Sequence, residues 1–154
     1  MSNTSRKKPR LEEWNYTEKG AYFITVCTKE KQEILCSIQT PAISGDDPIV
    51  KLTTIGEITE EALKKIPGID KFVIMPNHVH MIIYQEDEVS ISSKIRLWKT
   101  VITAKCKQNI WQSSFYDHII RDEKDYLIKW KYIDDNPMKW ASDEYYSNIT
   151  EGFL

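Results

Sequence analysis

The order of apolar segments in the 154-residue chain predicts an α+β domain built on an antiparallel sheet. Short runs of β-branched and aromatic residues, which favour strands, alternate with longer segments whose apolar residues recur at helical spacing. Their order is strand, helix, strand, strand, helix, strand, which is the order of a ferredoxin-like core. Two short apolar runs after the first strand add a hairpin insertion, and a helical segment after the last strand adds a C-terminal helix.

The first half of the chain contains the first strand, the insertion and the first helix. Residues 22–28 are rich in aromatic and β-branched side chains and predict a buried strand. The apolar runs at residues 32–38 and 49–54 flank a segment rich in Pro, Gly and Asp, which predicts a hairpin with a long loop. Residues 56–66 have helical spacing, and the Pro-Gly pair that follows ends this helix.

The second half contains three strands and two helices. The apolar run at residues 72–84 is interrupted by a Pro-Asn pair and predicts two strands joined by a tight turn. A helix begins near Ser90, and its apolar positions recur at helical spacing: Ile91, Ile95, Trp98 and Ile102. Residues 113–121 predict another strand, and residues 122–135 predict a last helix that ends at an Asn-Pro pair.

Composition and charge limit the classes of protein to consider. We expect one domain at residues 14–140, a flexible basic arm at residues 1–13 and a tail at residues 141–154. The formal net charge of −2 does not mark the whole chain as a nucleic-acid binder, but basic residues gather in the arm and in the helix after Ser90. Three cysteines without close pairing, and no secretory signal or membrane-spanning run, predict a cytoplasmic protein.

The motif Asn77-His78-Val79-His80 contains two of the three histidines in the chain. Side chains alternate between the faces of a strand, so His78 and His80 should project to the same side. Two imidazoles on one face form half of a site for a divalent metal ion. The same spacing also occurs where histidines serve only the core or the surface, so a functional site requires a nucleophile and further ligands elsewhere.

The last helix contains a candidate for that nucleophile. On a helical wheel, one apolar arc is expected to pack against the sheet, and it consists of Tyr126, Leu127, Trp130 and Ile133. Tyr132 lies off this arc, on a polar stripe with Lys129 and Asn136. A tyrosine on a polar stripe is compatible with a functional role, but spacing alone favours a structural one, because tyrosines commonly lie at core margins with a solvated hydroxyl.

Together these motifs resemble a known family. The Pro-Asn-His-Val-His segment between two strands resembles the signature of HUH endonucleases. Residues 111–121, which begin with Trp-Gln, and residues 132–137, which begin with the tyrosine, resemble segments of the single-tyrosine transposases of the insertion-sequence 200-like class. The resemblance is greatest to the REP-associated tyrosine transposases, and it runs from about residue 16 to residue 140 with the motifs in the family order.

The resemblance implies a reaction and roles for particular residues. His78 and His80 match the metal-binding pair, Tyr132 matches the nucleophile, and Asn136 matches a position that completes the metal site. The family cleaves single-stranded DNA beside a hairpin through a 5′-phosphotyrosine intermediate, and the free 3′-hydroxyl permits strand transfer. Mg²⁺ or Mn²⁺ suits two imidazoles, an amide and phosphate oxygens. We expect single-stranded or hairpin DNA as the partner, and a monomer rather than a homodimer.

Four further residues are candidates for contact with DNA, each with a structural alternative. Trp111 could stack on unpaired bases or lie in the core, and Lys99 could contact phosphates or be solvated. His118 could touch DNA or be a satisfied buried histidine. Lys129 could stabilise a tyrosinate or be a solvated helix lysine. Two other functions stay open: a non-catalytic nucleic-acid-binding regulator with this fold, and a small metal-dependent hydrolase that does not use Tyr132.

Overall fold

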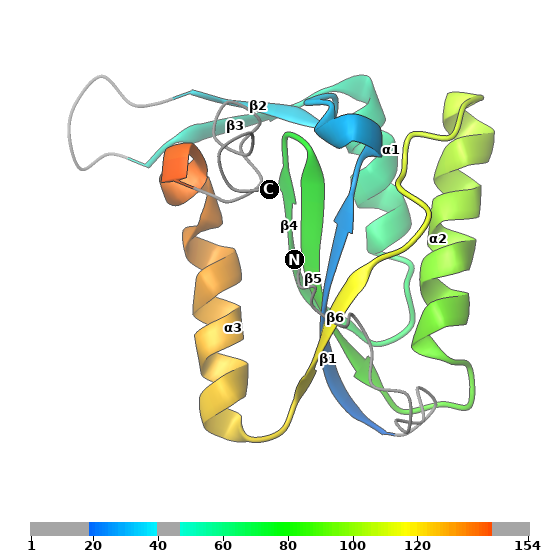
Figure 1. The fold of residues 1–154 in the computed structure, drawn as a ribbon, viewed down its shortest axis with the longest axis vertical. Helices are drawn as coiled ribbons and strands as arrows, with labels where there is room; N and C mark the ends of the chain where they lie inside the picture. The colour runs from blue at the N-terminus through cyan, green and yellow to red at the C-terminus, as the bar shows by residue number, and fades with distance from the viewer. Residues whose placement is uncertain (1–18, 40–46, 143–154) are drawn as a thin grey trace.

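A computed structural model of the chain describes residues 19–39 and 47–142, so the expected basic arm and nearly all of the expected tail lie outside the described residues. Four strands form an antiparallel sheet in the order β4-β5-β1-β6 (Figure 1). Their bounds are Gly20–Cys27 for β1, Ile69–Met75 for β4, His78–Gln85 for β5 and Tyr116–Ile120 for β6. This order confirms the predicted ferredoxin-like core.

The remaining elements of the described residues are a hairpin, three α-helices and two 3₁₀ segments. The predicted hairpin insertion consists of β2 (Cys36–Gln39) and β3 (Ile49–Leu52). The helices are α1 (Thr54–Leu63), α2 (Ile91–Cys106) and α3 (Glu123–Asp135), and the 3₁₀ segments are η1 (Lys29–Lys31) and η2 (Asn136–Ser142). Within the described ranges, none of the helices has the length and apolarity to span a membrane.

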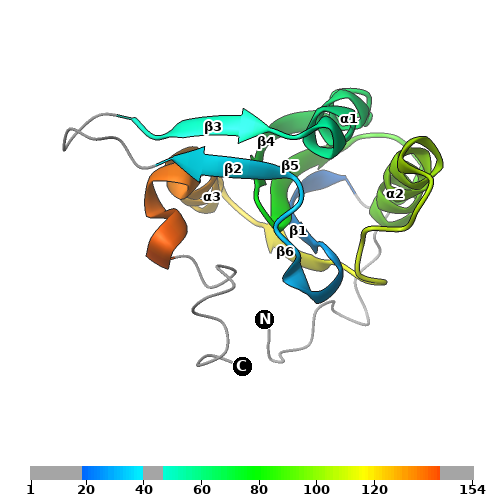
Figure 2. The same cartoon turned by 90° about the horizontal axis from the view of Figure 1, so that it is seen from above.

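Side chains alternate between the two faces of each strand, so both faces of the sheet carry apolar side chains. A helical layer covers each face. The pair α1 and α2 lies on one side of the sheet and α3 on the other (Figures 1 and 2). In β5, the buried side chains of Val79, Met81 and Ile83 join the main core with α1 and α2. Ile82, on the opposite face, packs with Ile133 of α3. The face that carries His78 and His80 is therefore the face that α3 covers.

Two element boundaries differ from the predictions for identifiable reasons. Helix α1 begins at Thr54, two residues early, because Thr53 caps it: its Oγ1 accepts a hydrogen bond from the Gly56 amide at 3.0 Å. Strand β6 begins at Tyr116 rather than at residue 113, and the preceding segment makes only an isolated bridge between Trp111 and Thr28. The α-helix ends before Asn136 as expected, and the chain continues as the 3₁₀ segment η2.

The predicted apolar arc of α3 is half right. Tyr126 and Ile133 pack against the sheet, but Leu127 is 56% exposed and Trp130 is 39% exposed. Helix α3 presents only a narrow face to the sheet, so the side chains at the edge of the arc stay in solvent. The Trp130 ring instead covers the ammonium group of Lys71, which lies 3.7 Å from the ring centroid.

Gly56 holds the first turn of α1 against the hairpin, and this contact gives a stability prediction. A Cβ atom at this position would lie 2.0 Å from the Leu35 carbonyl oxygen, which already accepts a hydrogen bond from the Thr53 amide. We expect Gly56→Ala to lower the free energy of unfolding by about 1–3 kcal/mol, measured by denaturant unfolding. The exposed control Glu57→Ala should change it by less than about 0.5 kcal/mol. Equal stability of the two variants would contradict this close approach.

Candidate active site

The tight turn before β5 places the two histidines side by side. His78 is the first residue of β5, and alternation along the strand brings His80 to the same face, as predicted. Their ring centroids are 4.6 Å apart and the ring planes meet at 71°. Both side chains are buried, with exposed fractions of 0% for His78 and 1% for His80. The pair therefore lies within the protein, under the helix that carries Tyr132.

Each histidine is oriented by a hydrogen bond at Nδ1. His78 Nδ1 lies 2.8 Å from Oδ1 of the buried Asn77, and His80 Nδ1 lies 2.8 Å from Oγ1 of Thr25. An amide oxygen only accepts, so His78 Nδ1 carries the proton and Nε2 carries a lone pair. The Thr25 hydroxyl can donate or accept, so it orients His80 without fixing its tautomer. In both rings Nε2 is the atom that would bind a metal ion.

Burial keeps both imidazoles neutral. It lowers the pKa of His80 to about 3. The pKa of His78 is well below its usual value, first because of burial and then because a protonated His78 would be repelled by a protonated His80 and by Lys31. The Asn136 side chain opposes this lowering. Neutral imidazoles offer lone pairs at pH 7, which is the form that binds metal ions.

Helix α3 brings Tyr132 and Asn136 to the histidine pair. The Tyr132 ring meets His80 edge to face at a centroid distance of 5.2 Å and lies 6.0 Å from Phe23, and its side chain is 38% exposed. Asn136, one turn further, is 2% exposed, and its Nδ2 donates to the Tyr132 carbonyl at 3.0 Å. Its buried Oδ1 is near enough to His78 to affect the pKa of that ring, but it makes no hydrogen bond of ordinary geometry to the described residues.

This donor set fits a small divalent cation. Two neutral imidazoles and a buried amide oxygen lie together, and the oxygen has a lone pair to offer. Within the described part of the chain, no group of three or more His, Cys, Asp or Glu side chains is arranged to hold a metal ion. A site with so few protein ligands suits an ion that keeps water and phosphate oxygens, as Mg²⁺ and Mn²⁺ do.

Two of the predicted DNA contacts have structural roles. The Trp111 ring is 1% exposed and packs on Trp98 at a centroid distance of 4.8 Å, so the expected stacking on bases is wrong and the core alternative holds. Lys99 donates from Nζ to the carbonyl oxygens of Gln112 at 2.8 Å and Ser114 at 3.2 Å. Its ammonium group thus fixes the loop before β6, and a contact with phosphate stays a prediction.

The other two candidates form a surface cluster along α3. His118 is not the buried histidine of the structural alternative, because its side chain is 47% exposed, and its Nε2 lies 2.7 Å from Asp125 Oδ2. Lys129 donates to the other oxygen of Asp125 at 3.2 Å. Partial burial raises the pKa of Asp125, but His118 and Lys129 together lower it by more than burial raises it. The net shift of the pKa is therefore downward. Asp125 precedes Tyr132 by two helical turns, about 10 Å.

The sequence did not reveal the residues that support the histidine pair. Asn77 entered the sequence analysis only as part of the Pro-Asn turn, and in the structure its side chain also orients His78. Its backbone oxygen also accepts hydrogen bonds from the Thr28 amide at 3.0 Å and the Thr28 hydroxyl at 3.1 Å. Thr25 became a candidate only through the strand register, which pairs it with His80 across β1 and β5. The one available signal was the position of Asn77 directly before the first histidine.

Comparisons with known proteins place transposases among the relatives of this chain. No family model matches the chain. An uncharacterized protein of Haemophilus influenzae is 32% identical over 174 residues, which cover 92% of this chain and 93% of the relative. A REP-associated tyrosine transposase of Escherichia coli is 28% identical over 153 residues, covering 89% of this chain and 83% of the relative. A solved structure of a REP-associated tyrosine transposase bound to a REP hairpin is similar with a TM-score of 0.62 and 28% identity, covering 84% of this chain and 74% of that chain.

A four-stranded antiparallel sheet with paired histidines under a tyrosine-bearing helix, together with these relatives, defines a transposase-like, DNA-processing enzyme. More narrowly, the chain is a homologue of the REP-associated tyrosine transposase of Escherichia coli, and its fold is similar to that of the hairpin-bound REP-associated tyrosine transposase. The family resemblance and the fold class inferred from the sequence are both confirmed.

Proposed function

We propose that this protein is a metal-dependent single-stranded DNA endonuclease and strand transferase that uses Tyr132 as its nucleophile. The observation that carries the proposal is the position of the Tyr132 ring against His80, one member of a buried, neutral histidine pair. The substrate is DNA beside a hairpin, which is supported by the similar transposase whose structure is bound to a REP hairpin.

The chemistry follows from the proposed site. His78, His80 and Asn136 would hold a divalent cation, and its positive charge would stabilise a phosphodiester under attack. The Tyr132 oxygen forms a bond to phosphorus, the bond from phosphorus to the 3′-oxygen breaks, and the phenolic proton leaves as the 3′-oxygen gains one. Phe23 and His80 flank the tyrosine ring and limit its orientations. Attack by a 3′-hydroxyl on the 5′-phosphotyrosine reverses these bonds and joins strands.

We also propose that the protein acts as a monomer. The ring contact between Tyr132 and His80 forms within one chain, so α3 brings the nucleophile to the site without a second copy. The Tyr126 hydroxyl donates to Asp70 at 2.5 Å and Lys71 pairs with Asp134 at 3.2 Å, and both contacts tie α3 to β4 of the same chain.

The direct test is formation of a covalent protein–DNA adduct. Labelled hairpin DNA with single-stranded arms is incubated with the protein and Mn²⁺ or Mg²⁺, then separated under denaturing conditions. We expect a denaturant-stable adduct and a released strand with a 3′-hydroxyl, and neither with EDTA. DNA binding without an adduct under any of these conditions would contradict the proposal and favour the non-catalytic regulator.

A further inference from the structure

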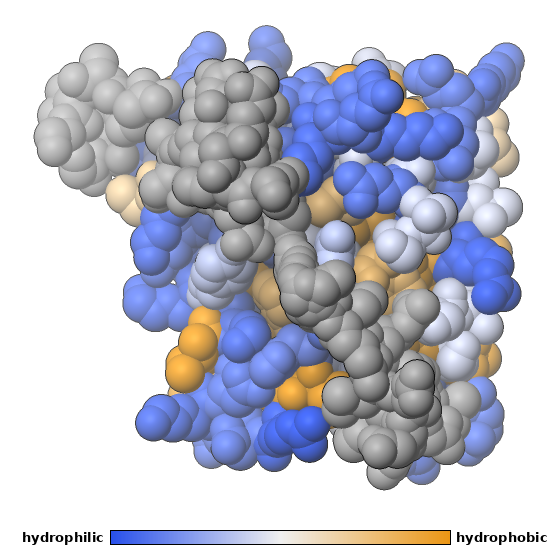
Figure 3. Space-filling view, viewed as in Figure 1, coloured by the Kyte–Doolittle hydropathy of each residue, from blue (hydrophilic) through white to orange (hydrophobic). Residues whose placement is uncertain are grey.

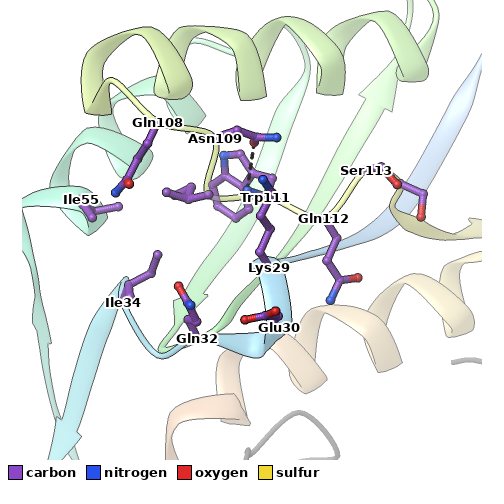
Figure 4. A pocket seen from close by; sticks show the side chains of 12 residues that line it. Lys29, Glu30, Gln32, Ile34, Ile55, Gln108, Asn109, Trp111, Gln112 and Ser113 are labelled. Atoms are coloured by element: carbon purple, nitrogen blue, oxygen red, sulfur yellow. Dashed lines mark hydrogen bonds between the residues drawn. The ribbon is translucent and has the colours of Figure 1, made fainter.

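A cleft lies beyond the end of β1, near the histidine site, and has no part in the chemistry above. Its volume is about 720 Å³, and its walls are the η1 turn with the residues after it on one side and residues 108–114 on the other (Figure 4). The η1 turn is hydrophilic on the surface of this face (Figure 3). Four lining residues belong to the main core or pack against it, namely Ile34, Ile55, Ile110 and Trp111. The polar side chains of the lining take no part in that core.

The lining suits a neutral polar ligand better than a phosphate. Four amide side chains line it, those of Gln32, Gln108, Asn109 and Gln112, together with two serine hydroxyls. The charged residues that line it are one cation and one anion, Lys29 and Glu30, so the lining lacks the positive excess that binds phosphate. Amides offer a donor and an acceptor side by side, which matches the edge of a nucleobase.

The cleft also has an apolar part. Ile34 and Ile55 lie at one end of it, and Gln112 and Ser113 lie at the other (Figure 4). A nucleobase has flat apolar faces and a polar edge, so one end of the cleft can cover a face while the amides meet the edge. A phosphate offers no such apolar face.

The walls of the cleft are held in place before any ligand arrives. The Lys29 amide donates to the Ile110 carbonyl at 2.9 Å, which ties the two walls together, and Gln112 Nε2 donates to the Thr28 carbonyl at 3.1 Å. Asn109 Oδ1 accepts from the Trp111 amide at 3.1 Å. Such a preformed cleft loses little conformational entropy when it binds.

Unusual backbone conformations surround the cleft. The non-glycine residues with positive φ in the described ranges are Glu30, Lys31 and Lys107, at 54°, 55° and 62°. Glu30 lines the cleft, Lys31 follows it, and Lys107 precedes Gln108. Left-handed backbone at ordinary residues is unfavourable and gathers at binding sites, where the surrounding structure enforces it. Lys107 is the left-handed C-cap of α2, so the strained positions at the wall of the cleft are Glu30 and the neighbouring Lys31 in η1.

The cleft lies close to the candidate active site along the chain, just beyond the end of β1. Cys27 pairs with His78 across the sheet, and Lys29, on the wall of the cleft, is two residues further, about 7 Å along the chain. Between them, Thr28 donates to the backbone of Asn77, the residue that orients His78. A DNA strand with a phosphate at the histidine pair therefore reaches the cleft within a few nucleotides.

We propose that this cleft binds one unpaired nucleobase of the cleaved DNA strand, with Gln32 and Gln108 contacting its polar edge. These two amides project into the cleft from opposite walls (Figure 4). The proposal rests on the proposed function to the extent that DNA is the substrate. It adds a site that selects the base near the cleaved phosphate.

The test measures DNA affinity in EDTA, so that it does not depend on cleavage. The probes are a fluorescent DNA hairpin with a single-stranded arm, the same hairpin without the arm, and a series with one abasic position in the arm. In the wild type, an abasic substitution at one position of the arm should weaken binding about tenfold. In Gln32→Ala/Gln108→Ala, the intact arm should bind about tenfold more weakly, and that abasic position should no longer matter.

The control is Gln39→Ala, an exposed glutamine on β2 outside the cleft, which should keep the wild-type abasic profile. Thermal unfolding of each variant verifies that it folds. An unchanged abasic profile in the double variant, or an equal loss of affinity for the armless hairpin, would overturn the proposal. These outcomes are separate from the adduct assay: a protein that forms an adduct but shows no such profile refutes only the base site, and the reverse result refutes only the nuclease.

Discussion

Tyr132→Phe is expected to abolish the covalent DNA adduct and to lower strand cleavage by several orders of magnitude, because it removes the attacking oxygen. Phenylalanine keeps the ring that packs against His80 and Phe23, so the fold and the affinity for DNA should change little. The measurements are adduct formation on a denaturing gel with Mn²⁺, and DNA affinity in EDTA. Loss of the adduct with retained affinity identifies the hydroxyl as the reacting group.

The matched control is Tyr126→Phe, which changes a second tyrosine of the same helix, α3. Its hydroxyl donates to Asp70 at 2.5 Å, and this hydrogen bond raises the pKa of Tyr126 to about 12, so it acts in packing and not as an attacking group. We expect this variant to keep the adduct at a small cost in stability. Cleavage that survives in Tyr132→Phe would show that the tyrosine is misassigned and would favour a hydrolase that uses the histidines alone.

The parts of the fold that the sequence predicted are those governed by local periodicity. The alternation in residues 72–84 gave two strands and put both histidines on one face, and helical spacing gave α2. The polar stripe of α3 singled out Tyr132, and the structure places its ring on His80. These features can be predicted from the sequence because the direction of a side chain in a strand or helix depends only on its position along that element.

The parts that could not be predicted depend on contacts between distant segments. Trp111 lies in the core because its ring packs on Trp98, which is distant in the sequence. Leu127 is exposed because only a narrow face of α3 packs against the sheet. Asn77 and Thr25 became supports of the site only through side-chain geometry and strand register. These are tertiary effects, and no spacing in a single sequence encodes them.

His80→Gln is expected to lower the affinity for Mn²⁺ by about 100-fold or more, because it removes one of two imidazole ligands while filling much of the same buried space. The readouts are Mn²⁺ binding by calorimetry and the rise in unfolding temperature that Mn²⁺ produces in the absence of DNA. Asn77→Leu, which leaves both imidazoles but removes the partner of His78 Nδ1, should lose about 10- to 100-fold.

The third histidine of the chain supplies the control that separates a metal site from general loss of a histidine. His118 is exposed and pairs with Asp125, so His118→Gln should leave Mn²⁺ affinity and the metal-induced stabilisation unchanged. A loss in His118→Gln as large as in His80→Gln would place the metal elsewhere. If only His80→Gln loses both the metal and the DNA adduct, the buried histidine pair holds the cation. The function of the pair is then to make a phosphate open to attack by Tyr132, and not to generate the nucleophile.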